Sequence, residues 1–584
     1  MMRGFATKVV VGAAAFAAVV VLYAQTAATD PMFQAMHDEM ERARKLTLNN
    51  LEAPYFVQYL IDESDNFAVS ASLGGVVSRR RSRYREPEVK VRVGDYKFDN
   101  SNFAGGGGGS RYDLQRFPLE NSYPLLRRYL WLETDSAYKS AVEAISRKRA
   151  ALRNMSQNEQ INDFAHAEPV KFVREFQKLA IDEDAWTNRV RALSAVFAKY
   201  PEVKNSSIEL EASTGGYSIL NSEGTEVREP ENVTYLRARA IAQAADGMSM
   251  RDALTFHAID LTRMPSDAEM TRGVSEMADN VVKLAHAPKG EDYSGPVLFE
   301  GAAGAQIMAE VLGQNLDLGR RPVADGGRGG GFTPSELEGR LGARVLPESF
   351  DVVDDPTQKE WHGRPLFGSY DVDREGVMAK PVRLIEKGVL KNYLLTRQPV
   401  RGFEGSNGRA RMPGNYGSST ATFSNLFINS SEGVPLAELK KKLIELCQTR
   451  GKPYGIIVRK MDFPSSASLD EVRRLLSGSQ GGRPVSIPIL AYKIYPDGRE
   501  ELVRALRFRG LTARSLKDIL AAGNDTAAFD FMDSPAPFAL IGASGFTAES
   551  CVIAPSILID DLELHPIEEQ LPKLPVVSAP QLSQ

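Results

Sequence analysis

Residues 368–377 read Gly-Ser-Tyr-Asp-Val-Asp-Arg-Glu-Gly-Val and lie in the second half of the chain, which is rich in glycine and in strand-forming residues. The carboxylates of Asp371, Asp373 and Glu375 alternate as they do at the opening of a calcium-binding loop. However, the twelfth position of such a loop is Val382 rather than a bidentate glutamate. We therefore interpret the segment as a structural turn within a large sheet and not as a metal site.

The sequence on both sides of this segment predicts strands and helices in separate groups. Pro496-Asp497-Gly498 lies between the predicted strands at 489–495 and 500–508, which is typical of a β-hairpin. In the first half, strands are predicted at 55–61, 67–73, 89–93, 206–210, 217–220 and 233–240, with Gly74-Gly75 and Pro87 as interruptions and a turn at Glu223-Gly224. Helical spacing predicts helices at 31–48, 123–178 and 266–286, the first with Met32, Met36 and Met40 as a core stripe.

This grouping favours an α+β fold over a doubly wound sheet, in which strands and helices would alternate. We expect an N-terminal α+β domain with a mixed sheet over residues 29–290 and a C-terminal domain dominated by an antiparallel sheet over residues 291–570. Residues 571–584 are predicted to be a flexible tail.

Several motifs accompany residues 368–377 in a fixed order along the chain. They are Asn221-Ser222-Glu223-Gly224-Thr225, Leu384-Ile385-Glu386-Lys387-Gly388-Val389-Leu390, Leu395-Thr396-Arg397, Ser406-Asn407-Gly408-Arg409-Ala410-Arg411 and Gly542-Ala543-Ser544-Gly545. In this order and spacing the chain resembles the TldD/PmbA family of metallopeptidase-related proteins, also known as the modulator-of-gyrase family. The resemblance spans residues 30 to 565 and implies a C-terminal domain built on a barrel-like antiparallel sheet.

Members of this family that cut peptides carry His-Glu-x-x-x-His on a helix and a cysteine near the C-terminus. Two imidazoles one turn apart and a thiolate can hold zinc, while the glutamate takes a proton from bound water. Placing that glutamate on Glu300 puts Phe299 at the first histidine and Gly304, or Ala305 with a different gap, at the second. The family cysteine falls on Ser544. We therefore expect no metal site and no cofactor in this chain, with Glu300 either a vestigial general base or a helix-start residue favoured by the helix dipole.

The histidines offer no replacement site in sequence. They are His37, His166, His257, His286, His362 and His565, and no two are three or four residues apart. A zinc site would have to gather ligands from distant segments. Cys447 and Cys551 are predicted to be separate buried thiols rather than a disulfide.

The N-terminus predicts export. Arg3 and Lys8 precede an apolar run at 9–23, and small residues follow at 24–28. The run is too short to span a bilayer comfortably and is typical of a signal peptide over residues 1–28, with an uncleaved membrane anchor as the alternative. Export would place the protein in the periplasm or outside the cell.

The charge distribution argues against nucleic acid as the main partner, because the formal net charge is −4. The only concentrated basic run is at 79–85. It is predicted to be a solvated strand face, and docking to an anionic envelope surface is the alternative.

The resemblance implies a dimer whose C-terminal domains enclose a cavity, where an extended peptide is held as an added strand. It also implies that PmbA-like members, which lack the zinc motif, partner a zinc-bearing TldD-like subunit. We therefore expect an exported, non-catalytic subunit that binds extended peptide while its partner supplies zinc. Two alternatives stay open, namely an active metallopeptidase with unconventional ligands and a free-standing peptide-binding scaffold homodimer in the envelope.

Overall fold

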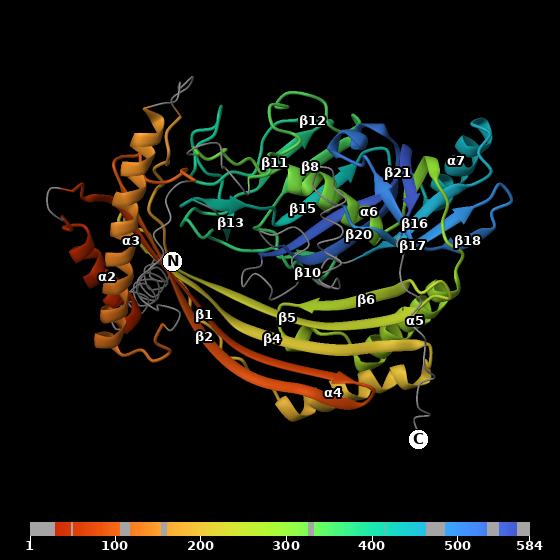
Figure 1. The fold of residues 1–584 in the computed structure, drawn as a ribbon, viewed down its shortest axis with the longest axis horizontal. Helices are drawn as coiled ribbons and strands as arrows, with labels where there is room; N and C mark the ends of the chain where they lie inside the picture. Colours follow the sequence, from red (N-terminus) through yellow and green to blue (C-terminus); the bar gives the residue numbers. More distant parts are fainter. Residues whose placement is uncertain are drawn as a thin grey trace, which may run out of the picture.

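The computed structural model describes residues 30–47, 51–104, 117–153, 161–324, 332–414, 416–462, 485–533 and 548–568. The predicted signal peptide at 1–28, Ser544 and the predicted tail at 571–584 lie outside these ranges. The fold is α+β, as the sequence predicts, and it contains two large sheets that lie one above the other in Figure 1. Strands up to residue 258 belong to the first sheet and strands from residue 293 to the second. The domain boundary at 290 stays a prediction.

The first sheet is a strongly curved layer of six strands. They are β1 (Pro54–Ser72), β2 (Gly75–Val93), β3 (Lys171–Val173), β4 (Val203–Asn221), β5 (Glu226–Gln243) and β6 (Ser249–Ala258). The order is β2-β1-β4-β5-β3, and β6 pairs with β5 beyond the end of β3. Each pairing is antiparallel except that of β3 with β5.

Two sequence predictions about this sheet need correction. The stretches at 55–61 and 67–73 form one continuous strand, β1, and Pro87 does not interrupt β2 but pairs with Ile61 inside it. A proline is tolerated there because β2 is an edge strand, so its missing N–H leaves no ladder bond unmade on the open side. Gly74, with a φ of 81°, forms the predicted turn between β1 and β2.

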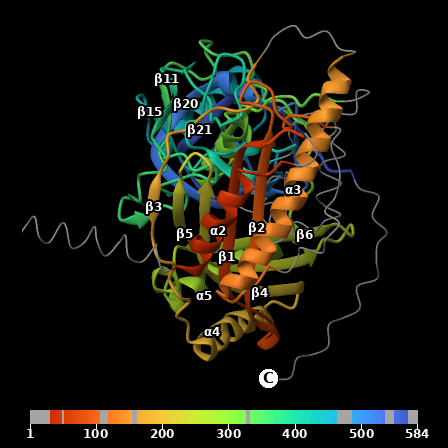
Figure 2. The same ribbon diagram turned by 90° about the vertical axis from the view of Figure 1, so that its left-hand side faces the viewer.

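Four helices cover the first sheet. They are α2 (Pro31–Ala43), α3 (Tyr123–Leu152), α4 (Glu183–Ala195) and α5 (Asp267–His286). Helices α2 and α3 pack over one end of β1 and β2, as Figure 2 shows, and bury the predicted methionine stripe. Helices α4 and α5 pack under the other end of the sheet. The prediction for 266–286 is confirmed, and a capping box between Ser266 and Glu269 explains why α5 begins where it does.

The helix predicted to reach residue 178 is too long. Helix α3 ends at Leu152, and the described residues that follow, 161–170, form no regular element. Their backbone bonds go to distant partners instead, because Asp163 N donates to Tyr96 O and Ala165 N donates to Arg397 O. Tertiary contacts have replaced the helical ladder that the local pattern favours.

The second sheet has eleven strands in the order β12-β11-β8-β15-β21-β7-β16-β17-β18, with β19 and β20 also paired to β21. Its strands are β7 (Tyr293–Phe299), β8 (Phe350–Asp354), β11 (Val382–Glu386), β12 (Val389–Leu390), β15 (Asn425–Ser430), β16 (Gly455–Met461), β17 (Pro488–Ile494), β18 (Glu500–Val503), β19 (Leu506–Arg509), β20 (Ile519–Asp533) and β21 (Ala548–Pro566). The β17–β18 hairpin confirms the prediction at 496–498.

The expected barrel is wrong for the described residues, since the path from β12 to β18 is an open sheet. It is also not purely antiparallel, because β7 pairs with β16 and β15 with β21 in parallel. Two short hairpin sheets, β9 (Glu360–Trp361) with β10 (Arg364–Pro365) and β13 (Ala410–Pro413) with β14 (Ser419–Ala421), flank the main one.

Two helices of the second half bear on the site, α6 (Ala302–Ile307) and α7 (Leu436–Thr449). Cys447 and Cys551 are buried and free, which confirms the prediction of two separate thiols. Of the helices in the described ranges, each is too short or too polar to cross a bilayer.

Candidate functional site

The positions predicted for the zinc motif surround the start of α6. Phe299 is the last residue of β7 and is fully buried in the core. Gly304 lies where α6 passes β21, and a Cβ atom there would be 2.6 Å from the carbonyl oxygen of Pro555. Ala305, the alternative second position, is also fully buried. No ligand side chain fits at residue 304 unless the backbone moves.

Glu300 lies before the helix rather than at its start, since α6 begins at Ala302. Its Oε2 atom accepts a hydrogen bond from Arg459 Nε at 2.7 Å, and Oε1 lies 3.1 Å from Lys440 Nζ on α7. Glu500 pairs with the same two cations. Glu300 is therefore a counter-ion between two basic residues, an arrangement that suits an anchor rather than a proton acceptor.

A second glutamate lies inside the helical segment ten residues later. The segment Ala309-Glu310-Val311-Leu312-Gly313-Gln314 has the spacing of His-Glu-x-x-x-His, with Ala309 and Gln314 at the histidine positions. It begins within a π-helical turn, Met308–Leu312, that continues α6. The sequence analysis did not consider this second alignment of the motif. The signal that points to it is that the family motif lies on a helix, and Glu310 is within the helical segment whereas Glu300 is not. Neither frame provides an imidazole.

The carboxyl group of Glu310 is enclosed and hydrogen-bonded. Gln306 Nε2 donates to it at 2.9 Å, and Ser486 donates through its backbone N at 2.8 Å and its hydroxyl at 2.7 Å. Burial raises the pKa of Glu310 to about 7, and those hydrogen bonds only partly oppose the rise. Gln306 also donates to the backbone oxygen of Asp462, whose carboxylate pairs with Arg251 of the first sheet.

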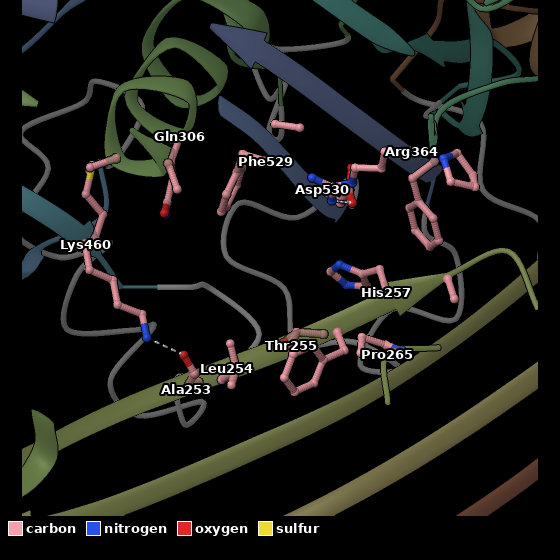
Figure 3. Close-up of a pocket in the computed structure, with 18 of the residues that line it drawn as sticks. Ala253, Leu254, Thr255, His257, Pro265, Gln306, Arg364, Lys460, Phe529 and Asp530 are labelled. Carbon is pink, nitrogen blue, oxygen red and sulfur yellow. Dashed lines mark hydrogen bonds and ion pairs between the residues drawn. The ribbon is translucent and has the colours of Figure 1, made fainter. Parts of the chain in front are cut away.

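Beside this helix the two sheets separate and leave a cavity of about 480 Å³. Figure 3 shows its two sides: β6 with Thr255 and His257 below, and Gln306 of α6 with Phe529 of β20 opposite. Arg364 closes one end. The size falls within the range of about 300–1,000 Å³ that is usual for ligand sites.

Strand β6 presents a free backbone edge to this cavity. The C=O of Ala253 accepts from Lys460 Nζ at 2.8 Å and its N–H donates to the Asp252 side chain at 2.7 Å, so both groups point away from β5. Alternate residues of an antiparallel strand point their backbone groups to the same side. Thr255 therefore turns its N–H and C=O to the free edge, where the described residues offer no partner.

Zinc does not fit the residues at this site. Apart from Glu310, which its neighbours already bond, the two motif frames provide phenylalanine, glycine, alanine and glutamine where ligands are needed. Within the described ranges no three His, Cys, Asp or Glu side chains gather in a group that could hold a metal ion. The histidines are dispersed, for example His37 beside Glu226, His286 beside Glu202 and His565 beside Asp292.

Away from the cavity the sheets are joined by buried polar contacts, which we call the seam and define by Asp62, Glu223, Glu229, residues 371–374 and Arg397. Arg374 donates twice to Asp62, with Nη1–Oδ1 at 2.9 Å and Nη2–Oδ2 at 2.5 Å. Arg397 donates to Glu223 Oε1 at 2.7 Å, and the N–H of residue 371 donates to Glu229 Oε1 at 2.9 Å. Residues 371–374 of the motif at 368–377 therefore form part of the seam.

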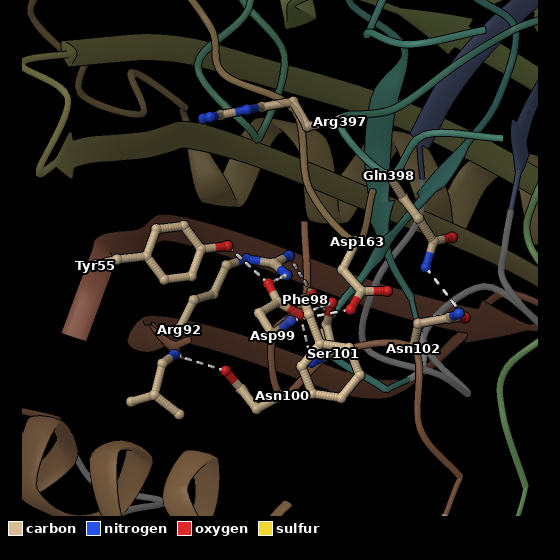
Figure 4. A network of polar contacts seen from close by, with 12 residues as sticks. Tyr55, Arg92, Phe98, Asp99, Asn100, Ser101, Asn102, Asp163, Arg397 and Gln398 are labelled. Carbon is tan, nitrogen blue, oxygen red and sulfur yellow. Dashed lines mark hydrogen bonds and ion pairs between the residues drawn. The ribbon is translucent and has the colours of Figure 1, made fainter. Parts of the chain in front are cut away.

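A second buried network lies next to the seam and is drawn in Figure 4. Asp99 accepts from Arg92 Nη1 at 2.7 Å and from the Tyr55 hydroxyl at 2.8 Å. Lys148 of α3 lies 2.6 Å from Asp163. Burial lowers the pKa of Lys148 and raises that of Asp163, so this pair depends on mutual contact to stay ionised. The acidic side chains within residues 371–375 also have a structural role. For example, the Asp373 carboxylate accepts hydrogen bonds from three backbone N–H groups.

Fold and site together define an α+β protein related to metallopeptidases whose metal-binding positions hold other residues. Residues 292–461 match the family described as PmbA/TldA metallopeptidase C-terminal domain. Over these residues the chain belongs to the TldD/PmbA family.

Relatives support this placement over part of their length. The chain is 24% identical over 252 residues to a metalloprotease of Archaeoglobus fulgidus, covering 43% of this chain and 50% of the relative. It is 35% identical over 192 residues to a metalloprotease of Methanocaldococcus jannaschii, covering 32% of this chain and 35% of the relative. The matches thus span half or less of these curated relatives.

Solved structures share the fold over most of the chain. TldE from Thermococcus kodakarensis has a TM-score of 0.54 and 14% identity, and covers 91% of this chain and 99% of its own. A candidate modulator of a DNA gyrase from Thermotoga maritima has a TM-score of 0.56 and 17% identity over the same shares of both chains. At these identities the likeness shows the fold alone.

Proposed function

We propose that this chain is an exported, non-catalytic subunit that holds an extended peptide for a zinc-bearing TldD-like partner. One observation carries the proposal: the helix that would hold zinc lies over a cavity with an open strand edge, yet both motif frames lack ligands. The site retains what is needed to hold a peptide and lacks what is needed to activate water.

The open edge supports peptide binding in particular. A strand edge with free N–H and C=O groups binds an extended chain through main-chain bonds, and this mode needs no metal. Thr255 offers such groups next to the cavity, and Lys460 closes the edge at Ala253. An added strand would then run along β6 from residue 255 toward the C-terminal end of β6.

The partner and the location rest on resemblance and on the N-terminal sequence. The solved relative TldE shares this fold. PmbA-like members lack the zinc motif, so a zinc-bearing subunit is the partner that would complete the site. Residues 1–28 support export to the periplasm or beyond.

The test is zinc content and peptide cleavage of the full chain, alone and co-expressed with a His-Glu-x-x-x-His relative from the same genome. We expect less than a tenth of an equivalent of zinc in the isolated chain by elemental mass spectrometry, about one equivalent per heterodimer, and chelator-sensitive cleavage by the complex only. Stoichiometric zinc with cleavage by the isolated chain would overturn the non-catalytic role. If the chain forms a homodimer and does not bind the co-expressed relative, the proposed role as a subunit of a zinc-bearing complex would be overturned.

A further inference from the structure

The wall of the cavity is largely apolar. Ala302 and Ala303 of α6, Met461 of β16, Phe367, and Ala528 and Phe529 of β20 contribute to it. These side chains come from four separate segments of the second half. Such a surface favours the burial of apolar groups from a ligand.

Three of the four cations that line the cavity have counter-ions, and the fourth, Arg263, is exposed to solvent. Arg364 pairs with Asp530, as Figure 3 shows, and Lys460 Nζ lies 2.5 Å from Asp252 Oδ1. Arg459 is held by Glu300 at 2.7 Å. A charged ligand side chain would give up its hydration without gaining an unpaired opposite charge from these three groups.

His257 adds no charge either. Its side chain projects from β6 into the cavity, and the centre of its ring lies 5.1 Å from the centre of the Phe367 ring. Burial lowers the pKa of His257 to about 4, so the imidazole is neutral at physiological pH. Apart from the exposed Arg263, the cavity is therefore close to neutral as well as apolar.

The geometry of β6 sets which ligand side chains enter the cavity. Successive side chains of a strand point to opposite faces. Thr255 and His257 face the cavity, whereas Leu254 and Phe256 also pack on the side of α5, where both approach Gly273. In a strand added to β6, the residue opposite Thr255 faces the cavity and its neighbours do not.

We propose that this cavity selects extended peptides with a large apolar side chain, such as leucine or phenylalanine, at the position opposite Thr255. The selection rests on the proposed function, because it needs a peptide on β6. It adds a side-chain preference to a binding mode that main-chain bonds alone would leave indifferent to sequence.

The test uses the full chain and five fluorescent heptapeptides, alike except for Leu, Phe, Ala, Asp or Lys at the centre, with affinity measured by anisotropy. We expect the Leu and Phe peptides to bind about tenfold or more tightly than the Asp and Lys peptides. The Thr255→Val variant should bind the five peptides in the same order of affinity as wild type. Thr255→Asp should weaken the Leu peptide about tenfold and favour the Lys peptide, because it puts an unpaired carboxylate in the cavity.

Two further variants keep the result interpretable. Ala302→Asp adds a carboxylate to the opposite wall, at a helix start that tolerates it, and should produce the same reversal. Thr271→Asp places the same charge on an exposed turn of α5 and should change nothing. Equal affinity for all five peptides would overturn the selectivity and leave peptide binding intact. No binding of any peptide would overturn both the selectivity and the proposed function.

Discussion

The seam and the cavity are two ways in which the same two sheets meet. At the seam, Arg374 and Arg397 are buried, and they are bonded to Asp62 of β1 and to Glu223 of the β4–β5 turn, respectively. At the cavity, the sheets part, and the backbone groups that Thr255 turns to the free edge of β6, like the Thr255 hydroxyl, have no hydrogen-bond partner among the described residues. Three of the motifs that indicate the family, at 221–225, 368–377 and 395–397, contribute residues to the seam, whereas the positions of the family's zinc motif near the cavity hold no histidine. The resemblance therefore reports how the sheets are joined and not what the site does.

Breaking the seam should have the largest effect. Asp62→Ala removes the bidentate carboxylate of the buried Arg374 and leaves only longer-range attraction from Glu231 and Glu88, so the loss of unfolding free energy should be about 3–5 kcal/mol. Asp65→Ala on the same strand is the matched control, because its ion pair with Arg81 is partly exposed and contributes about 0–1 kcal/mol. Urea denaturation measures both, and equal losses would show that the seam is no stronger than a surface contact.

The second largest effect on stability is expected where α6 closely approaches β21. Gly304→Ala places a methyl group 2.6 Å from the Pro555 oxygen and should cost about 1–3 kcal/mol. Gly405→Ala, at a glycine with open space around its Cβ position, should change stability by less than about 0.5 kcal/mol. Thermal unfolding of the two variants checks the difference. A Gly304→Ala protein as stable as wild type would mean that α6 can shift away and that the site could admit a ligand there.

Glu310, which lies near the cavity, should make the stability of the protein depend on pH. Its folded pKa is about 7 against 4.5 when unfolded, so the folded protein keeps a proton that the unfolded chain releases as pH rises. The stability of wild type therefore falls between about pH 4.5 and 7, by about 2–3 kcal/mol from this group. Glu310→Gln removes this loss. Its stability relative to wild type should rise from pH 5 to pH 8, and a difference that is constant with pH would contradict the assignment.

Glu300→Gln should have the smallest effect. Its ion pairs with Arg459 and Lys440 are partly exposed, with the cations 32% and 27% accessible, so the loss should be about 0.5–1 kcal/mol and shrink at high salt. Peptide cleavage by a complex with a zinc-bearing partner should be unchanged. A fall of about a hundredfold or more would instead show that Glu300 acts as a general base.

Local patterns predicted much of the fold. The methionine stripe of α2, the capped helix α5 and the β17–β18 hairpin each depend on residues close in sequence, so periodicity and turn chemistry were sufficient. The end of α3 was not predictable in this way, because residues 163 and 165 bond to partners elsewhere in the chain. Pro87 was misleading because only the sheet order shows that β2 is an edge.

The site was predicted only in outline. The resemblance placed the zinc motif near the start of α6, where the sequence has no histidine, but it chose Glu300, which precedes the helix. The helical position of Glu310 and its contact with Ser486 are tertiary facts. The cavity itself joins residues 255, 302, 367, 461 and 529, and no local pattern brings these together.

The contact between Gly304 and Pro555 also bears on redesign. An engineer who wished to install a metal in this scaffold could not begin by writing histidines into the first half of α6, because the space next to residue 304 is already filled by the main chain of β21. The helix and the central strand would have to be rebuilt together. The backbone as well as the side chains therefore excludes a metal ligand at residue 304, and a few point substitutions could not install one.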